Sequence, residues 1–186
     1  PRVMLAGHCD QIGFLIQHIG DDGFLSFGGI GGHPRAVLLG QTVRVWTAGG
    51  PVPGVIARRA NRLLSVDEGS KAPEIHDLWI DIGARDGDEA RALTRVGDPV
   101  TYELGVTELL NGNIASPATD NRVGVWIVME AARRVAESDA QLAVAAVSTV
   151  QEEIGTRGAQ TSAFALDPDI GIAVDILKAC VAAGQG

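Results

Sequence analysis

The most informative residues of this chain are two adjacent carboxylates, Glu152 and Glu153. They follow directly on an apolar run, Leu142 to Val150, that is typical of a buried strand. A charged pair at the mouth of a core strand is costly unless a counter-charge lies nearby. The two neighbouring carboxylates would also repel each other. The pair therefore indicates a functional site with a counter-charge rather than a solvated loop.

Three other strand-like runs also end in groups that can bind a cation. These runs and their polar residues are Val3–Gly7 before His8 and Asp10, Ile114–Thr119 before Asp120, and Ile170–Val174 before Asp175. In open α/β sheets, sites form outside the carboxyl ends of the strands. Zinc and similar cations accept imidazole nitrogen and carboxylate oxygen, and one carboxylate can bridge two ions ~3.5–4 Å apart. The sequence therefore predicts a two-metal hydrolytic centre at one edge of a sheet.

Taken singly, each of these residues also has an ordinary structural interpretation. His8 and Asp10 would point the same way on an extended strand, so one could bind a metal while the other orients it. They could equally be a hydrogen-bonded histidine and a solvated carboxylate. Asp120 could be a helix N-cap, and Asp175 a simple strand end. Their predicted meeting at one edge favours the metal site. The other histidines, His18, His33 and His76, show no ligand spacing and are expected at the surface or in turns.

The chain divides into two parts with different hydrophobic patterns. From Phe14 to Leu104, short alternating runs broken by turn residues predict a small β barrel or sandwich, with one short helix over 86–93. After Gly105, strands alternate with helices expected over 121–136 and 158–165, which is typical of a covered, largely parallel sheet. The predicted fold class is therefore α/β, with a mostly parallel sheet interrupted by an inserted small β-barrel-like domain. The expected domains are 1–13 with 105–186, and 14–104.

Composition excludes several function classes. The formal net charge of −8 and the pI near 4.9 disfavour nucleic acid or an anionic membrane as a partner. No apolar stretch approaches the ~20 residues that span a bilayer, and no secretory signal pattern is visible. Cys9 and Cys180 are too few and too far apart for a disulfide scaffold. We expect a cytoplasmic protein.

An ordered set of short motifs runs through nearly the whole chain. They are His-x-Asp-x-Ile-Gly-Phe at His8 to Phe14, Leu39-Gly40-Gln41, Gly54-Val55-Ile56, Asp77 to Ala84, Val96 to Pro99, Asp-x-Arg-x-Gly at Asp120, Gln-Glu-Glu-x-Gly at Gln151, and Pro168-Asp169 leading to Asp175. Each motif is weak alone, but their order and spacing are highly specific. The chain resembles the dinuclear metallo-aminopeptidases that include glutamyl aminopeptidase and the tetrahedral aminopeptidases, some of which carry the name endoglucanase or cellulase.

The resemblance implies a fold, an assembly and a role for each site residue. It implies a metallopeptidase α/β domain with an inserted β domain used in assembly, and hence a homo-oligomer. It implies two divalent ions, zinc or cobalt, and a peptide substrate. The implied roles are Asp120 as the bridging ligand, His8 and Asp175 as ligands of one ion, Glu153 as a ligand of the other, Glu152 as the general base, and Asp10 as the residue that orients His8.

The chain departs from the family pattern at several points. Gln11 stands where Glu is usual, and Asn121 replaces the second Asp of an Asp-Asp-Arg motif. The family's second ion also takes a His from a later segment that this sequence does not contain, so we expect this chain to hold at most one ion tightly and to hydrolyse peptides poorly.

The resemblance favours one function among several. The expected function is an aminopeptidase that removes N-terminal residues from peptides through an activated water. The alternatives are a carboxypeptidase or amide deacylase of the same clan, or a non-catalytic assembly module with a crippled site. Cellulose cleavage usually needs two carboxylates across an aromatic-lined groove, and an aromatic content of 4% gives it no support.

Overall fold

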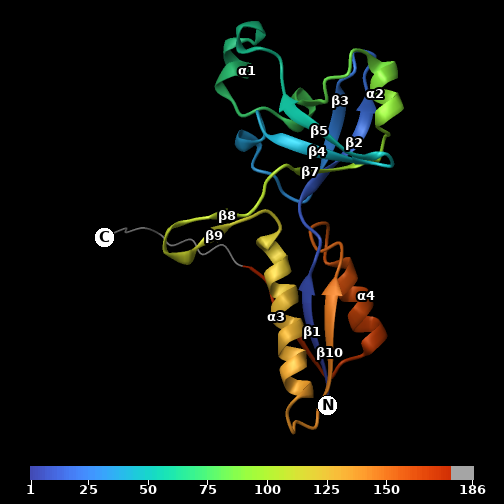
Figure 1. Ribbon diagram of the computed structural model, residues 1–186, viewed down its shortest axis with the longest axis vertical. Coiled ribbons are helices and arrows are strands. Elements are labelled where there is room, and N and C mark those ends of the chain that lie inside the picture. The colour runs from blue at the N-terminus through green and yellow to red at the C-terminus, as the bar shows by residue number, and fades with distance from the viewer. Residues whose placement is uncertain (177–186) are drawn as a thin grey trace. The chain divides into compact units, whose positions relative to one another are not determined.

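The computed structural model describes residues 1–176 and divides into two compact units (Figure 1). The sheet unit comprises Pro1–Gln11 and the chain from Ala118 onward, and the barrel unit comprises Ile12–Pro117. The chain thus enters the barrel unit directly after its first strand and returns to complete the sheet unit. The structure places residues 105–117 in the barrel unit, whereas the sequence led us to expect them in the other domain. In the described part of the chain, no helix is long and apolar enough to cross a membrane.

The sheet unit is built on three parallel strands in the order β10-β1-β11. These strands are β1 (Arg2–His8), β10 (Ala143–Thr149) and β11 (Ile170–Ala173). Helices α3 (Thr119–Ala136) and α4 (Arg157–Leu166) both pack against β1 and β10 and flank them in Figure 1. The central strand β1 is buried from Met4 to His8, and Val128 of α3 completes this core. Because all three strands run the same way, their carboxyl ends lie at one edge.

The strand expected over Ile114–Thr119 is wrong in both extent and partner. Only Ile114 and Ala115 are extended, as β9, and they pair antiparallel with β8 (Thr107–Glu108) rather than joining the parallel sheet. Pro117 has no N–H for a strand ladder and restricts the residue before it. Ala118 then adopts a left-handed conformation, with φ 58°. Asp120 therefore comes from the start of α3 and not from a strand end.

The barrel unit is a closed barrel with the strand order β2-β3-β6-β5-β4-β7. All of its strand pairs are antiparallel. The strands are β2 (Gly13–Ile19), β3 (Leu25–Ile30), β4 (Thr42–Thr47), β5 (Gly50–Ala57), β6 (Trp79–Asp81) and β7 (Pro99–Tyr102). Alternate side chains point inward, and Phe14, Leu25 and Val43 are fully buried in the core. Of the two architectures that the sequence left open, the barrel is the one present.

Short helical segments connect the barrel strands. They are the helices α1 (Val66–Ser70) and α2 (Gly87–Leu93) and the 3-10 turns Arg35–Val37, Asn61–Leu63 and Ile75–Asp77. A further 3-10 turn, Leu110–Gly112, connects β8 and β9, which form a separate two-stranded sheet. The expected helix over 86–93 is confirmed. Its N-cap is Asp86, whose carboxylate accepts a hydrogen bond from the N–H of Glu89.

His33 is not the simple surface or turn histidine that its sequence context suggested. Its ring stacks on Phe14 with 4.2 Å between centroids. Nε2 lies 2.8 Å from the carbonyl oxygen of Gly13, and Nδ1 lies 2.9 Å from the hydroxyl of Tyr102. Because a carbonyl oxygen can only accept, Nε2 carries the proton and Nδ1 is free to accept from Tyr102. His33 therefore fastens the beginning of β2 to the end of β7 inside the barrel unit.

Candidate metal centre

His8, the last residue of β1, lies at the centre of the polar cluster and is only 3% exposed. Two glycines let the backbone that carries it approach α3 closely. A Cβ added at Gly7 would lie 2.8 Å from the carbonyl carbon of Gly124, and one added at Gly124 would lie 2.1 Å from Oδ1 of Asn121. Gly7 thus lets the strand approach the helix backbone, and Gly124 leaves room for the side chain of Asn121 in the first turn of the helix.

The hydrogen bonds of His8 determine which of its ring nitrogens can bind a cation. Nδ1 lies 3.1 Å from the backbone oxygen of Asp10, which can only accept, so Nδ1 carries the proton. In the neutral ring, Nε2 then presents its lone pair. It lies 3.2 Å from a carboxylate oxygen of Asp120 and 3.6 Å from one of Asp175. A lone pair that faces carboxylate oxygens needs a cation or a proton between them.

Asp120 reaches this nitrogen from the irregular first residues of α3. Its φ and ψ of −80° and 109° are not helical, so the regular helix begins only after Asn121. The peptide bond between Asp120 and Asn121 is cis. The side chain of Asp120 is 57% exposed, and its free face is open to a ligand. The carboxylate of Asp120 thus reaches His8 from the irregular residues that precede the regular part of α3.

Glu152 and Glu153 lie in a tight turn between β10 and α4. Gln151, just before them, has a left-handed backbone with φ 58°, a costly conformation for a residue with a side chain. The carboxylate of Asp10 accepts the backbone N–H groups of both glutamates, with Oδ1 to Glu152 and Oδ2 to Glu153 each at 3.2 Å. Asp10 therefore fastens this turn to the end of β1.

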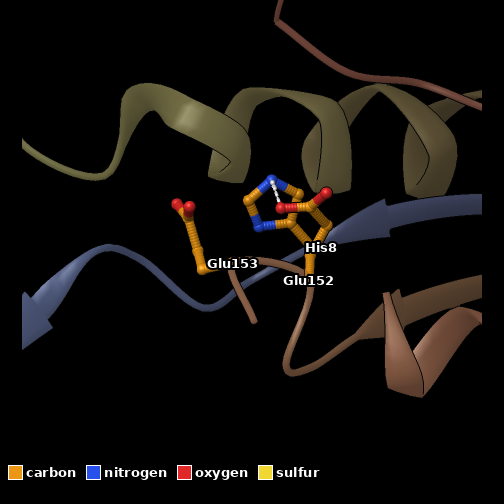
Figure 2. A group of neighbouring side chains, drawn as sticks. All are labelled: His8, Glu152 and Glu153. Carbon is orange, nitrogen blue, oxygen red and sulfur yellow. Dashed lines mark ion pairs between the residues drawn. The ribbon is translucent and has the colours of Figure 1, made fainter. Parts of the chain in front are cut away.

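The two glutamate side chains reach the His8 ring from this turn. Figure 2 shows them on either side of the ring, with a Glu152 oxygen 3.7 Å from Nε2. Asp10 is less close to the ring than its implied role suggested. Its carboxylate lies 3.5 Å from Nδ1, further away than its own backbone oxygen.

Asp175 follows β11 by two residues and approaches His8 from the other neighbouring strand. The N–H of Val174 donates to the carbonyl oxygen of Ala6 at 2.8 Å, which continues the pairing of β11 with β1. This bond holds Val174, which precedes Asp175, beside Ala6, which lies two residues before His8. The side chain of Asp175 is 49% exposed.

The surroundings of the cluster raise the pKa of two of its groups, His8 and Glu153. Burial alone would lower the pKa of His8. The hydrogen bond with the Asp10 backbone and the charges of Glu152, Asp10 and Asp175 outweigh burial, and the pKa is raised. Burial, followed by the charge of Asp120, raises the pKa of Glu153. Several negative charges thus act on His8 and Glu153 together.

Two trios of side chains have the composition and spacing of a cation site. They are His8 with Glu152 and Glu153, and His8 with Asp120 and Asp175, and the ligand atoms within each trio lie within 4.8 Å of one another. Imidazole nitrogen with carboxylate oxygen is a donor set that zinc accepts. The residues therefore fit a divalent metal. The structure brings together all of the residues that the sequence singled out.

The sequence pattern did not reveal how Asn121 is used. Its side chain is fully buried, donates from Nδ2 to the carbonyl oxygen of Val174 at 2.7 Å and accepts from the N–H of Gly124 at 3.0 Å. The replacement of the family's Asp by Asn at this position was the one sequence feature that could have indicated a special role for Asn121.

Comparison with known proteins matches both the order of these motifs and the fold. A family model described as M42 glutamyl aminopeptidase matches residues 1–185. The lysyl aminopeptidase of Pyrococcus furiosus is 36% identical over 179 residues, which are 95% of this chain and 51% of that protein. The chain thus spans about half the length of the curated relatives it matches.

Two solved structures share the fold. The TET aminopeptidase from the marine sediment archaeon Thaumarchaeota archaeon SCGC AB-539-E09 is 39% identical, with a TM-score of 0.89 over 95% of this chain and 51% of that one. The Pyrococcus horikoshii TET1 peptidase, which can assemble into a tetrahedron or a large octahedral shell, is 33% identical, with a TM-score of 0.81 over 94% of this chain and 52% of that one. The chain belongs to the M42 glutamyl aminopeptidase family.

Proposed function

We propose that this protein acts as a metal-dependent aminopeptidase that removes N-terminal residues from peptides. The observation that carries the proposal is the environment of His8 Nε2. This nitrogen faces oxygens of Asp120, Asp175 and Glu152 from a ring whose other nitrogen is occupied by a backbone oxygen. Aminopeptidase activity is what the names of the relatives state. The cluster supplies the donor set that such a hydrolase needs.

The proposed ligands divide between two divalent ions, zinc or cobalt. His8 and Asp175 would hold one ion, Glu153 would hold the other, and Asp120 would bridge them. One observation supports this division: His8, Asp120 and Asp175 form one compact trio, whereas Glu153 belongs to a second trio, with His8 and Glu152. When bound, such ions supply Lewis-acid chemistry that polarises a carbonyl and acidifies water.

Glu152 is the proposed general base. Its carboxylate is 32% exposed and therefore accessible to a water molecule. It would take a proton from the attacking water and return it to the leaving amine, so that one carboxylate serves first as base and then as acid. Asp10 would keep Glu152 in place through the backbone N–H that it accepts. This contact uses the backbone of Glu152 and leaves its carboxylate available for the proton.

The same proposal extends to the assembly. The barrel unit is proposed to mediate self-association into a homo-oligomer, and the sheet unit to carry the reaction. Support comes from the Pyrococcus horikoshii TET1 peptidase, which can assemble into a tetrahedron or a large octahedral shell.

Hydrolysis of a matched pair of peptides tests the proposed reaction. The full-length gene product would be incubated with a short unblocked peptide and with its N-acetylated counterpart, with zinc or cobalt and then with a chelator. We expect free amino acids from the unblocked peptide only, and none after chelation. Cleavage of the acetylated peptide would instead indicate a deacylase or carboxypeptidase, and metal binding without turnover would indicate an assembly module.

A further inference from the structure

Asn121 connects the two backbone segments that carry Asp120 and Asp175. It directly follows Asp120 in the chain, and its side-chain Nδ2 donates to the carbonyl oxygen of Val174, the residue directly before Asp175. The N–H of Val174 in turn donates to Ala6 of β1, two residues before His8. The buried amide of Asn121 thus connects, directly or through Val174, the segments that carry the proposed ligands Asp120, Asp175 and His8.

The surroundings of Asn121 demand a side chain that both donates and accepts. The carbonyl oxygen of Val174 can only accept, and the N–H of Gly124 can only donate. An amide satisfies both groups at once. An ionised carboxylate would place an oxygen against the Val174 oxygen with no proton between them. An apolar residue would leave the carbonyl oxygen of Val174 and the N–H of Gly124 without these hydrogen bonds, which is unfavourable for groups shielded from water.

The packing leaves Asn121 little freedom to move. Its side chain is fully buried, and a Cβ added at Gly124 would lie 2.1 Å from its Oδ1. A side chain held this tightly transmits its position to the backbone on either side of it. The bond from Gly124 fixes the Asn121 side chain to α3, and the bond to Val174 then links the segment of Asp120 to that of Asp175.

From this geometry we infer that Asn121 is a positioning residue for the metal centre. It sets the distance between Asp120 and Asp175. The family pattern has Asp at this position, and an Asp would have to be protonated to donate to the Val174 oxygen, whereas the amide of Asn121 donates without an added proton. This inference rests on the proposed metal site. It goes beyond that proposal because Asn121 itself has no atom among the proposed ligands.

Variants at Asn121 separate positioning from general stability. Asn121→Asp keeps the size and removes the donor, and Asn121→Ala removes both hydrogen bonds. The control is Thr149→Val, which changes a buried residue in register with His8 whose hydroxyl donates to Gly7 and not to the Asp120 or Asp175 segments. For each protein, the unfolding midpoint would be measured in chelator, the Kd for zinc by calorimetry, and the visible absorption bands with cobalt.

We expect both Asn121 variants to bind zinc about 10-fold to 100-fold more weakly than the unchanged chain and to show altered cobalt bands. Thr149→Val should lower only the unfolding midpoint. Unchanged zinc affinity and cobalt bands in folded Asn121 variants would overturn the inference, and so would an equal loss in Thr149→Val. If Asn121→Asp does not fold, Asn121→Ala decides. Failure of both to fold would show a folding role and reject positioning. Absence of zinc binding in the unchanged chain would overturn the proposed metal site itself.

Discussion

Glu152 and Glu153 are neighbours in sequence but differ in their surroundings. Burial, followed by the charge of Asp120, raises the pKa of Glu153, so this carboxylate lies close to other negative groups of the cluster. The carboxylate of Glu152 is 32% exposed and lies 3.7 Å from Nε2 of His8. A carboxylate beside other carboxylates suits a cation ligand, and one that water can reach suits a base.

The first prediction separates these two roles. In the full-length gene product, Glu152→Gln should abolish most turnover and leave the metal content near that of the unchanged protein. Glu153→Gln should instead deplete the metal, because it removes a ligand. Metal analysis after dialysis, together with peptide hydrolysis, provides the check. Equal metal loss in both variants would contradict the assignment.

The raised pKa of His8 predicts how metal affinity depends on pH. A cation needs Nε2 without its proton, so binding releases a proton from any His8 that carries one. Because the pKa lies above its ordinary value, this competition should already act near neutral pH. Zinc affinity should fall from about pH 8 to about pH 6, and approach tenfold per pH unit below the raised pKa.

Calorimetry in buffers of different ionisation enthalpy would measure the protons released along with the affinity. The His8→Ala variant serves as the comparison, since it lacks the titrating ligand. Zinc affinity that is the same across this pH range, with no proton release, would show that His8 is not a ligand.

At the scale of elements, the site depends on the close approach of β1 and α3. Gly7→Ala would place a Cβ 2.8 Å from two backbone atoms of the helix start. The strand and helix must then separate, which we expect to cost about 1–3 kcal/mol and to weaken zinc binding. Gly171→Ala in β11 is a matched control, because a Cβ there would meet nothing within 4 Å.

Urea unfolding and zinc titration of both glycine variants would test this prediction. The expected result is a loss of stability and of zinc affinity in Gly7→Ala alone. Comparable behaviour of the two variants would show that close packing of β1 on α3 does not position the site.

Hydrophobic periodicity predicted the longer elements well. The helices expected over 86–93, 121–136 and 158–165 form within two residues of these bounds, because apolar spacing and local capping chemistry determine them. The strand over 114–119 failed because the apolar pattern cannot show which partner a segment pairs with. The Pro117 in that run was the local sign against it.

The same limit applies to the site. The motifs identified the residues around His8, because each motif is a short contiguous stretch of sequence. It could not show that Asp10 holds the Glu152 turn or that Asn121 holds Val174, because each partner lies far away along the chain. Such hydrogen bonds follow from tertiary structure.

At the scale of the whole molecule, the two units suggest a division of labour. The described site residues all belong to the sheet unit, and the barrel unit has a complete hydrophobic core of its own. Replacing residues 12–117 with a short flexible linker in the full-length gene product should lower the mass found by light scattering. Retained zinc binding would show that the sheet unit still folds. An unchanged number of subunits would contradict the proposed assembly role.

The central claim is that the cluster around His8 binds a divalent metal, and zinc titration of the 186-residue chain tests it most directly. Three proteins would be compared: the unchanged chain, His8→Ala, and His18→Ala, whose histidine lies exposed on β2. We predict tight binding of one ion by the unchanged chain and by His18→Ala, and its loss in His8→Ala. Tight binding that survives in His8→Ala, or that is absent from the unchanged chain, would contradict the account.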